Sequence, residues 1–260
     1  MRILITNDDG INAPGLKTLH AIAETLAGPS GEVWTVAPAF EQSGVGHMIS
    51  YTRPMIVSKM GERRFAVEGA PADCVLAGLH DVLNGQHVDL ILSGVNYGNN
   101  SAENALYSGT LGGAIEGALQ GIPAMALSQF LGPDNFNIDD PFEAAAQHGA
   151  DVVRKVLEHG PADDGDYRLF YNINFPPVPG ASVKGVRASA QGFRRYTKFG
   201  IEPHLSPSGR RFLWVKGGQQ GEKTAPGTDA HDNLEGYVSV TPMRADFTAH
   251  DMLAPLKAIE

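Results

Sequence analysis

The sequence predicts an α/β fold in which a mostly parallel β-sheet is covered by helices on both faces. Short apolar segments typical of buried strands alternate with helical patterns from the N-terminus to about residue 130. Each strand segment is apolar almost without interruption, as expected for a sheet that is buried on both faces. Hydrophobic residues make up 42% of the 260 residues, which is enough to form one large core.

The first strand and the first helix are expected at the N-terminus. Residues 2–6 have Ile-Leu-Ile at their centre and are bounded by turn residues, as in a buried strand. Asp8 and Asp9 follow in a turn that ends at Gly10, and apolar residues at helical spacing then run from 16 to 26. The two carboxylates therefore lie where parallel sheets bind their ligands, at the carboxyl end of a strand.

The same alternation continues along the chain. Strands are expected at residues 33–37, 89–93, 123–128 and 169–175, with short β segments within 49–68. Helices are expected at residues 71–83, 111–119 and 142–159. From about residue 180 Gly and Pro become frequent, and β segments at 184–189, 211–216 and 237–241 suggest antiparallel hairpins partly outside the main sheet. Such extended arms often pair with another subunit.

Charge and composition exclude several classes of protein. Lys and Arg number 20 against 29 Asp and Glu, a net charge of −9, which argues against binding duplex nucleic acid along a basic face. The single cysteine, Cys74, excludes an intramolecular disulfide. Neither a signal peptide nor a membrane span of ~20 apolar residues is evident. We therefore expect a cytoplasmic protein without a membrane partner.

The adjacent carboxylates of Asp8 and Asp9 suggest a metal site. Like charges repel, and a divalent cation with oxygen ligands would offset this repulsion. Ser43 follows the strand at 33–37 and Asn96 follows the strand at 89–93, so both should reach the same sheet edge. Hydroxyl and amide oxygens are acceptable ligands for Mg²⁺ or Mn²⁺. The alternative is that these are ordinary turn residues, with one carboxylate capping a helix.

A phosphate site is suggested just before the Gly-rich helix. Ser108, Gly109 and Thr110 would supply hydroxyls, backbone N–H groups and the positive end of a helix dipole, which together suit a phosphate. We expect Asn96 to contact the substrate as well as the metal. Each motif alone is ordinary turn material, and their shared location is the reason to combine them.

Several motifs together resemble the SurE (survival protein E) family. They lie at residues 5–15, 42–44, 93–100, 107–110, 227–229 and 236–242, in the family's order, and the resemblance runs to about residue 250. It implies a Rossmann-like three-layer α/β/α sandwich with a C-terminal β-hairpin extension used in oligomerisation, in a homodimer or homotetramer. It also implies a metal-dependent phosphatase that hydrolyses nucleoside 5′-monophosphates, and 3′-monophosphates as well, to nucleoside and phosphate.

The resemblance also assigns the metal ligands. Carried over residue by residue, they fall on Asp8, Asp9, Ser43 and Asn96, which would hold one divalent ion per subunit, Mg²⁺ or Mn²⁺. We also count Asp8 as catalytic, because its loss should abolish activity.

The family's acid/base pair falls on Asp246 and His250, in the sequence Asp-Phe-Thr-Ala-His. Four residues apart, the two side chains would share one helix face. His250 would transfer protons, and Asp246 would orient its ring. His231 is a competing histidine that the family pattern does not require. The alternative is that Asp246 is a helix N-cap and His250 is solvated.

We treat the chain as one domain with three parts: a core at about 1–178, a β-rich extension at about 179–245, and a C-terminal helix at about 246–260 that returns to the active site. Two other functions remain open. A haloacid-dehalogenase-type phosphatase would need Asp-x-Asp with an Asp nucleophile, whereas this chain has Asp-Asp-Gly. A non-catalytic nucleotide- or metal-binding module would leave Asp246 and His250 without a role.

Overall fold

The computed structural model describes residues 1–161 and 165–260. Within these residues the strands are β1 (Arg2–Thr6), β2 (Glu32–Pro38), β3 (Val57–Gly61), β4 (Arg64–Val67), β5 (Leu90–Tyr97), β6 (Ala124–Gln129), β7 (Phe170–Phe175), β8 (Val186–Ala188), β9 (Gly200–Leu205), β10 (Arg211–Lys216) and β11 (Val238–Met243). The α-helices are α1 (Pro14–Ala27), α2 (Pro71–Ala77), α3 (Gly109–Leu119), α4 (Glu143–His159), α5 (Asp229–Leu234) and α6 (His250–Leu256). A π-helical turn, η1 (Gly78–Val82), follows α2, and 3₁₀ turns lie at η2 (Ala102–Tyr107), η3 (Gly180–Ser182) and η4 (Lys257–Ile259).

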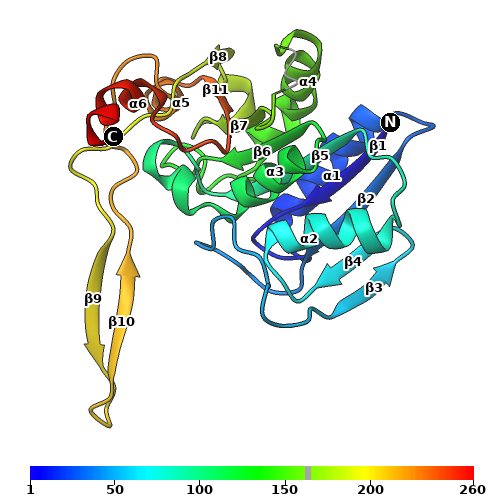
Figure 1. The fold of residues 1–260 in the computed structure, drawn as a ribbon, viewed down its shortest axis with the longest axis horizontal. Helices are drawn as coiled ribbons and strands as arrows, with labels where there is room; N and C mark the ends of the chain where they lie inside the picture. The colour runs from blue at the N-terminus through cyan, green and yellow to red at the C-terminus, as the bar shows by residue number, and fades with distance from the viewer. Residues whose placement is uncertain (162–164) are drawn as a thin grey trace.

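A mostly parallel sheet forms the middle layer, in the order β3-β4-β2-β1-β5-β6-β7-β11-β8 (Figure 1). Its helices cover both faces because successive side chains of each strand point in opposite directions. Ile3 and Ile5 of β1 pack with α1 and α4 in one core cluster, whereas Leu4 packs with α2 and α3 in another. The predicted three-layer α/β/α fold is confirmed.

The strand order reverses direction beside β1. β1 pairs with β2 on one side and with β5 on the other, both in parallel register. The chain therefore builds one half of the sheet outward from β2 and the other half outward from β5. Thr6 at the end of β1 lies opposite Ser93 of β5, so the turn carrying Asp8 and Asp9 meets the end of β5 at this switch point.

The sheet differs from the expectation in two places. β5 does not end at Ser93 but continues to Tyr97, past an irregularity between Ser93 and Asn96 in its pairing with β6. The segments near 184–189 and 237–241 do not form hairpins outside the sheet. β11 instead pairs antiparallel with β7, and β8 pairs parallel with β11, which extends the main sheet. Local sequence shows that a segment is extended but does not identify its partner.

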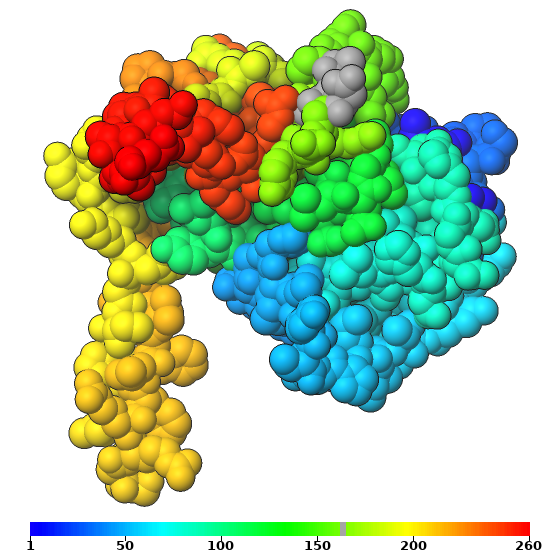
Figure 2. All heavy atoms as spheres, in the orientation of Figure 1, coloured from blue at the N-terminus to red at the C-terminus, as the bar shows by residue number. Residues whose placement is uncertain are grey.

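An antiparallel hairpin of β9 and β10 lies apart from the main sheet and projects from the body (Figures 1 and 2). The segment 211–216 was expected, whereas β9 was not. All six residues of β10 are exposed. Among the described residues, no helix has the length and apolar character needed to cross a membrane.

Candidate active site

A cavity of about 660 Å³ opens where β1 and β5 end. Five residues expected at the site from the sequence contribute to its wall, namely Asp8, Asp9, Ser43, Asn96 and Ser108. The remaining lining residues are Gly44, Tyr97, Asn99, Asn100, Asn104, Tyr107, Phe199, Val215 and Gln220. The structure thus brings together side chains from the first turn, the loop after β2, the end of β5 and the start of α3.

Asp8 is the most buried carboxylate at this cavity, with only 4% of its surface exposed. Its Oδ1 accepts a 2.7 Å hydrogen bond from the hydroxyl of Thr110. Burial, and then the neighbouring charge of Asp9, raise the pKa of Asp8 to about 7. The ionised form of Asp8 is thus disfavoured in the metal-free protein, and a bound cation would stabilise it.

Asp9 is partly buried and faces the end of β5. Its Oδ2 accepts a 3.0 Å hydrogen bond from the backbone N–H of Tyr97. Burial raises the pKa of Asp9, and the charge of Glu41 raises it further, while the Tyr97 N–H acts in the opposite direction. The sequence analysis did not single out Glu41, although it lies two residues before Ser43.

The loop carrying Ser43 is attached to the site by its backbone. The N–H of Gln42 donates to the carbonyl of Asp8 at 2.7 Å, and the N–H of Gly46 donates to the carbonyl of Tyr107 at 3.0 Å. The hydroxyl of Ser43 donates to Oε1 of Glu41 at 2.8 Å. Because the hydroxyl proton is directed toward Glu41, the Ser43 oxygen presents its lone pairs elsewhere.

Asn96 lies in the last part of β5 and is half-buried. Its Nδ2 donates to the carbonyl of Gly98 at 2.9 Å, so its Oδ1 is the atom that a cation would contact.

The donor set fits a hard divalent cation. Two carboxylates, a hydroxyl and a carboxamide oxygen are the ligand types that Mg²⁺ and Mn²⁺ accept. In the residues that the structure describes, no three His, Cys, Asp or Glu side chains form a group that could hold a metal ion. A cation held here would therefore depend on neutral oxygen donors in addition to Asp8 and Asp9.

The start of α3 lies directly against Asp8. The hydroxyl of Ser108 caps the helix by accepting from the N–H of Leu111 at 3.1 Å. A Cβ added to Gly109 would lie 2.9 Å from Cβ of Asp8, so only glycine allows this approach. The hydroxyls of Ser108 and Thr110 both form hydrogen bonds within the protein. Gly109 contributes only its backbone to the first turn of α3.

A buried network behind the site was not expected from the sequence. Nδ2 of Asn100 donates to the Thr110 hydroxyl at 3.2 Å and to the Ser128 hydroxyl at 2.8 Å. The N–H of Asn100 donates to Oδ1 of Asn174 at 2.8 Å. The signal in the sequence is that three mostly apolar strands end in polar residues, at 97–100, 128 and 172–174. Polar residues at strand ends usually belong to turns, so the sequence alone does not show that these side chains meet.

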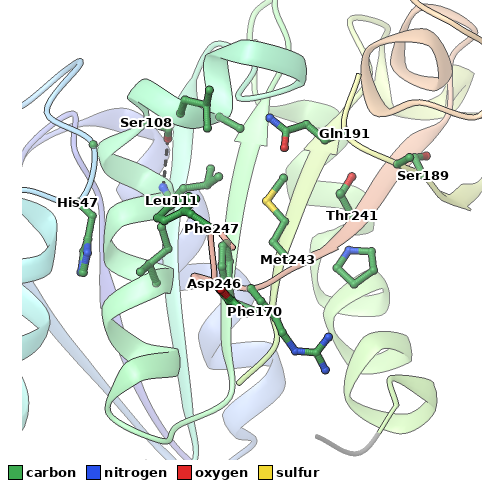
Figure 3. Close-up of a pocket in the computed structure, with 17 residues that line it drawn as sticks. His47, Ser108, Leu111, Phe170, Ser189, Gln191, Thr241, Met243, Asp246 and Phe247 are labelled. Carbon is green, nitrogen blue, oxygen red and sulfur yellow. Dashed lines mark hydrogen bonds between the residues drawn. The ribbon is translucent and has the colours of Figure 1, made fainter. Parts of the chain in front are cut away.

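A second cavity of about 640 Å³ has Asp246 in its wall (Figure 3), whereas His250 is not among its lining residues. Asp246 lines this cavity, and Ser108 lines both cavities. His250 Nε2 lies 2.5 Å from Oδ2 of Asp246, and the His250 side chain is 70% exposed. Hydrogen bonds from Thr248 and then from His250 lower the pKa of Asp246 to about 2.

The structure pairs Asp246 with His250, but the expectation that they share one helix face is wrong, because Asp246 lies before the first residue of α6. Neither residue lines the cavity that holds Asp8. The alternative is wrong in making Asp246 the N-cap, but it agrees with the structure for His250, an exposed residue of the first turn of α6. α6 begins at His250 with Ala249 as its N-cap, so Asp246 precedes the helix. His231, in α5, lines neither cavity.

Comparisons with known proteins identify the family of this chain. Residues 3–198 match the family model described as "Survival protein SurE". The chain is 71% identical over 259 residues to a protein named "5'-nucleotidase SurE" from Roseobacter denitrificans, covering 100% of this chain and 99% of that one. A protein of the same name from Ruegeria pomeroyi is 70% identical over 258 residues and 99% of both chains. The solved structure "Crystal Structure of Sure Protein from Aquifex aeolicus" has a TM-score of 0.81 and 36% identity, covering 100% of this chain and 99% of that one. The chain belongs to the SurE family.

Proposed function

We propose that this chain is a metal-dependent 5′-nucleotidase that hydrolyses nucleoside 5′-monophosphates, and 3′-monophosphates as well, to nucleoside and phosphate. The observation that carries the proposal is the convergence of Asp8, Asp9, Ser43 and Asn96 on one cavity. Relatives about 70% identical over the full length are named 5′-nucleotidases, which supports the same reaction here.

Asp8, Asp9, Ser43 and Asn96 would hold one divalent ion, Mg²⁺ or Mn²⁺, per subunit. When bound, such an ion offsets negative charge on the phosphate and lowers the pKa of a water molecule. Asp8 and Asp9 would both be ionised in that state, because the cation would offset the cost of burying their charges, which is the main reason that their pKa values are raised.

The N-terminal turn of α3 would orient the phosphate. Gly109 brings its backbone against Asp8, which places the positive end of the helix dipole next to the metal ligands. Ser108 and Thr110 hold this turn in position through their own hydrogen bonds.

Asp246 and His250 form the proposed acid/base pair. The low pKa of Asp246 keeps it ionised at working pH, where it can orient the His250 ring and stabilise the imidazolium. Ser108 lines both cavities, so the cavity that contains Asp246 adjoins the cavity that contains the metal ligands. Proton transfer by His250 would require the C-terminal segment 246–260, of this or a second copy, to come closer to Asp8.

The hairpin and the C-terminal helix support assembly into a homodimer or homotetramer. Apolar side chains of β10 are exposed, including Leu213 (56%) and Trp214 (67%). In the C-terminal segment Phe247 is 85% exposed. An isolated two-stranded hairpin is marginally stable in water, so a second copy of the chain is the partner we propose. A cytoplasmic location stays a prediction from the sequence.

The function is tested by phosphate release from a panel of nucleoside 5′- and 3′-monophosphates. The protein is first treated with EDTA, and Mg²⁺, Mn²⁺, Co²⁺ or Zn²⁺ is then added back singly. We expect no release with EDTA and recovery with Mg²⁺ or Mn²⁺. Saturable nucleotide binding without any phosphate release would instead favour the non-catalytic module, and a trapped phosphoaspartyl intermediate would favour the haloacid-dehalogenase alternative.

A further inference from the structure

We infer that Tyr107 and Phe199 form a stacking surface for the base of the nucleotide. The inference rests on the proposed function, because it assigns one end of the same substrate. Phe199 belongs to the stem of the β9–β10 hairpin, by which we mean residues 194–199 and 217–220. This part of the chain carries none of the proposed metal or acid/base residues.

The two rings lie in the wall of the metal-site cavity. Their centroids are 4.8 Å apart and their planes are inclined by 65°, an edge-to-face arrangement. Tyr107 is 50% exposed and Phe199 is 45% exposed, although both line the cavity that contains Asp8 and Asp9. The aromatic residues of the core are different, since Phe170 is 2% exposed. Uncovered aromatic surface at this position is therefore available to a ligand.

The hairpin stem is fixed to the loop beneath the cavity on both sides of Phe199. Before it in sequence, the guanidinium of Arg194 is fully buried and donates to Oδ1 of Asn99 at 3.1 Å. After it, Oε1 of Gln220 accepts from Nδ2 of Asn104 at 2.6 Å. These anchors hold the Phe199 ring against Tyr107 before any ligand binds, which reduces the entropy cost of binding.

The wall of this one cavity combines two kinds of chemistry. Asp8, Asp9 and Asn96 contribute carboxylate and amide oxygens, and Tyr107 and Phe199 contribute aromatic surface. A nucleoside monophosphate has the matching shape, with an anionic group at one end and a flat aromatic base at the other. Its volume suits a cavity of about 660 Å³. Tyr97 also lines the cavity, but its backbone N–H bonds to Asp9, which places Tyr97 beside the proposed metal ligands.

The test compares a substrate that has a base with one that lacks it. The Phe199→Leu variant keeps apolar bulk and removes the aromatic face. We expect its KM for adenosine 5′-monophosphate to rise by about tenfold, in the range of base-stacking losses. Its KM for ribose 5-phosphate should stay within about twofold of the wild-type value.

The matched control is Phe212→Leu, which removes an exposed ring from the same hairpin outside the cavity lining. It should change neither KM. Equal losses on both substrates in Phe199→Leu would mean that Phe199 only supports the fold, and the inference would be wrong. Equal KM values of the wild-type protein for both substrates would also overturn it.

Binding without turnover separates this inference from the proposed function. Equilibrium dialysis of adenosine 5′-monophosphate with the EDTA-treated protein should show about tenfold weaker binding for Phe199→Leu than for wild type. If no phosphate is released under any condition, the nucleotidase proposal fails, and this measurement still decides whether the aromatic pair binds a base. Unchanged binding in the variant would reject the stacking surface.

Discussion

The hydroxyl of Thr110 donates a 2.7 Å hydrogen bond to Oδ1 of Asp8, across 102 positions of the sequence. Asn100 in turn donates to the same hydroxyl at 3.2 Å. The chain of bonds orients the Asp8 carboxylate, and the Thr110 bond lowers its pKa against the larger effect of burial. Thr110 is therefore a positioning residue for the proposed metal site.

Replacing Thr110 by Val should weaken metal binding. The side chains have similar shapes, but Val cannot donate to the Asp8 carboxylate. A hydrogen bond to a charged group contributes about 1.5–3 kcal/mol, so we expect the Kd for Mn²⁺ to rise by about 10- to 100-fold. Calorimetric titration with Mn²⁺ at neutral pH measures this change. Thr110→Ser keeps the hydroxyl and serves as the control, and equal affinities for the Val and Ser variants would contradict the assigned role.

Replacing Asp8 by Asn should abolish phosphate release while leaving the fold intact. Asn has nearly the same shape but lacks the charge that a divalent cation requires. Steady-state assays over a range of Mg²⁺ and Mn²⁺ concentrations measure the loss. Full turnover by this variant at saturating metal would exclude Asp8 as an essential ligand.

Asp8→Asn should also stabilise the fold when no metal is present, although it abolishes activity. The folded pKa of Asp8 is about 7, above its ordinary value of 3.8. Its protonated form therefore favours folding below about pH 4, and this contribution is lost as the pH rises to 7. In EDTA, the free energy of unfolding of Asp8→Asn should increase relative to wild type between these pH values, by about 4 kcal/mol at most.

Urea unfolding at a series of pH values in EDTA measures this difference. Asp151→Asn is the control, since Asp151 is exposed on α4 and its pKa is lowered by the hydrogen bond from Lys155. A difference between Asp8→Asn and wild type that does not vary with pH would show that Asp8 is already ionised in the folded, metal-free protein.

The sequence predicted the central sheet well because buried parallel strands have a strong local signal. Ile3, Leu4 and Ile5 are all fully buried, with alternate residues serving opposite faces. The same reasoning placed Asp8 and Asn96 at one edge, because the ends of neighbouring parallel strands must meet there. The strand order itself, which puts β1 next to β5, is not visible in any local pattern.

The cavity wall contributed by the hairpin stem could not be predicted in this way. Phe199 and Gln220 are far in sequence from Tyr107, and the β segments between them are mostly exposed. Arg194 is fully buried although arginine is rarely buried without several partners. Its hydrogen bonds to Asn99 and Ser101 depend on tertiary contacts that composition and periodicity do not report.

His250→Ala should lower the rate more than His231→Ala. His250 is paired with the ionised Asp246, which lines the second cavity, whereas neither cavity is lined by His231 or by a residue that bonds to it in this way. Steady-state kinetics of both variants, with circular dichroism to check their folding, measures the order. The opposite order would transfer the proton-transfer role to His231. Because the pKa of Asp246 is about 2, its titration should not contribute to the pH–rate profile above about pH 4.

Substitution of Trp214 by Lys should reduce the oligomeric state. Trp214 is 67% exposed in β10, where it lies opposite Glu202 of β9. Burial of such a side chain against a second copy stabilises association, and a charged group at the same position opposes it. Sedimentation velocity at micromolar concentration should show a dimer or tetramer for wild type and a smaller species for Trp214→Lys. Glu202→Gln, a polar change at a partly exposed position on the same face, is the control.

Tryptophan fluorescence gives an independent measure of the same association. The chain has two tryptophans, and Trp34 is half-buried and stacks with Phe65. An emission shift on dilution should therefore come mainly from Trp214, whose ring leaves an apolar interface for water as the oligomer dissociates. The shift should move to longer wavelength and should be absent in Trp214→Phe. A wild-type protein that sediments as a monomer, with emission independent of concentration, would show that the hairpin has no role in self-association.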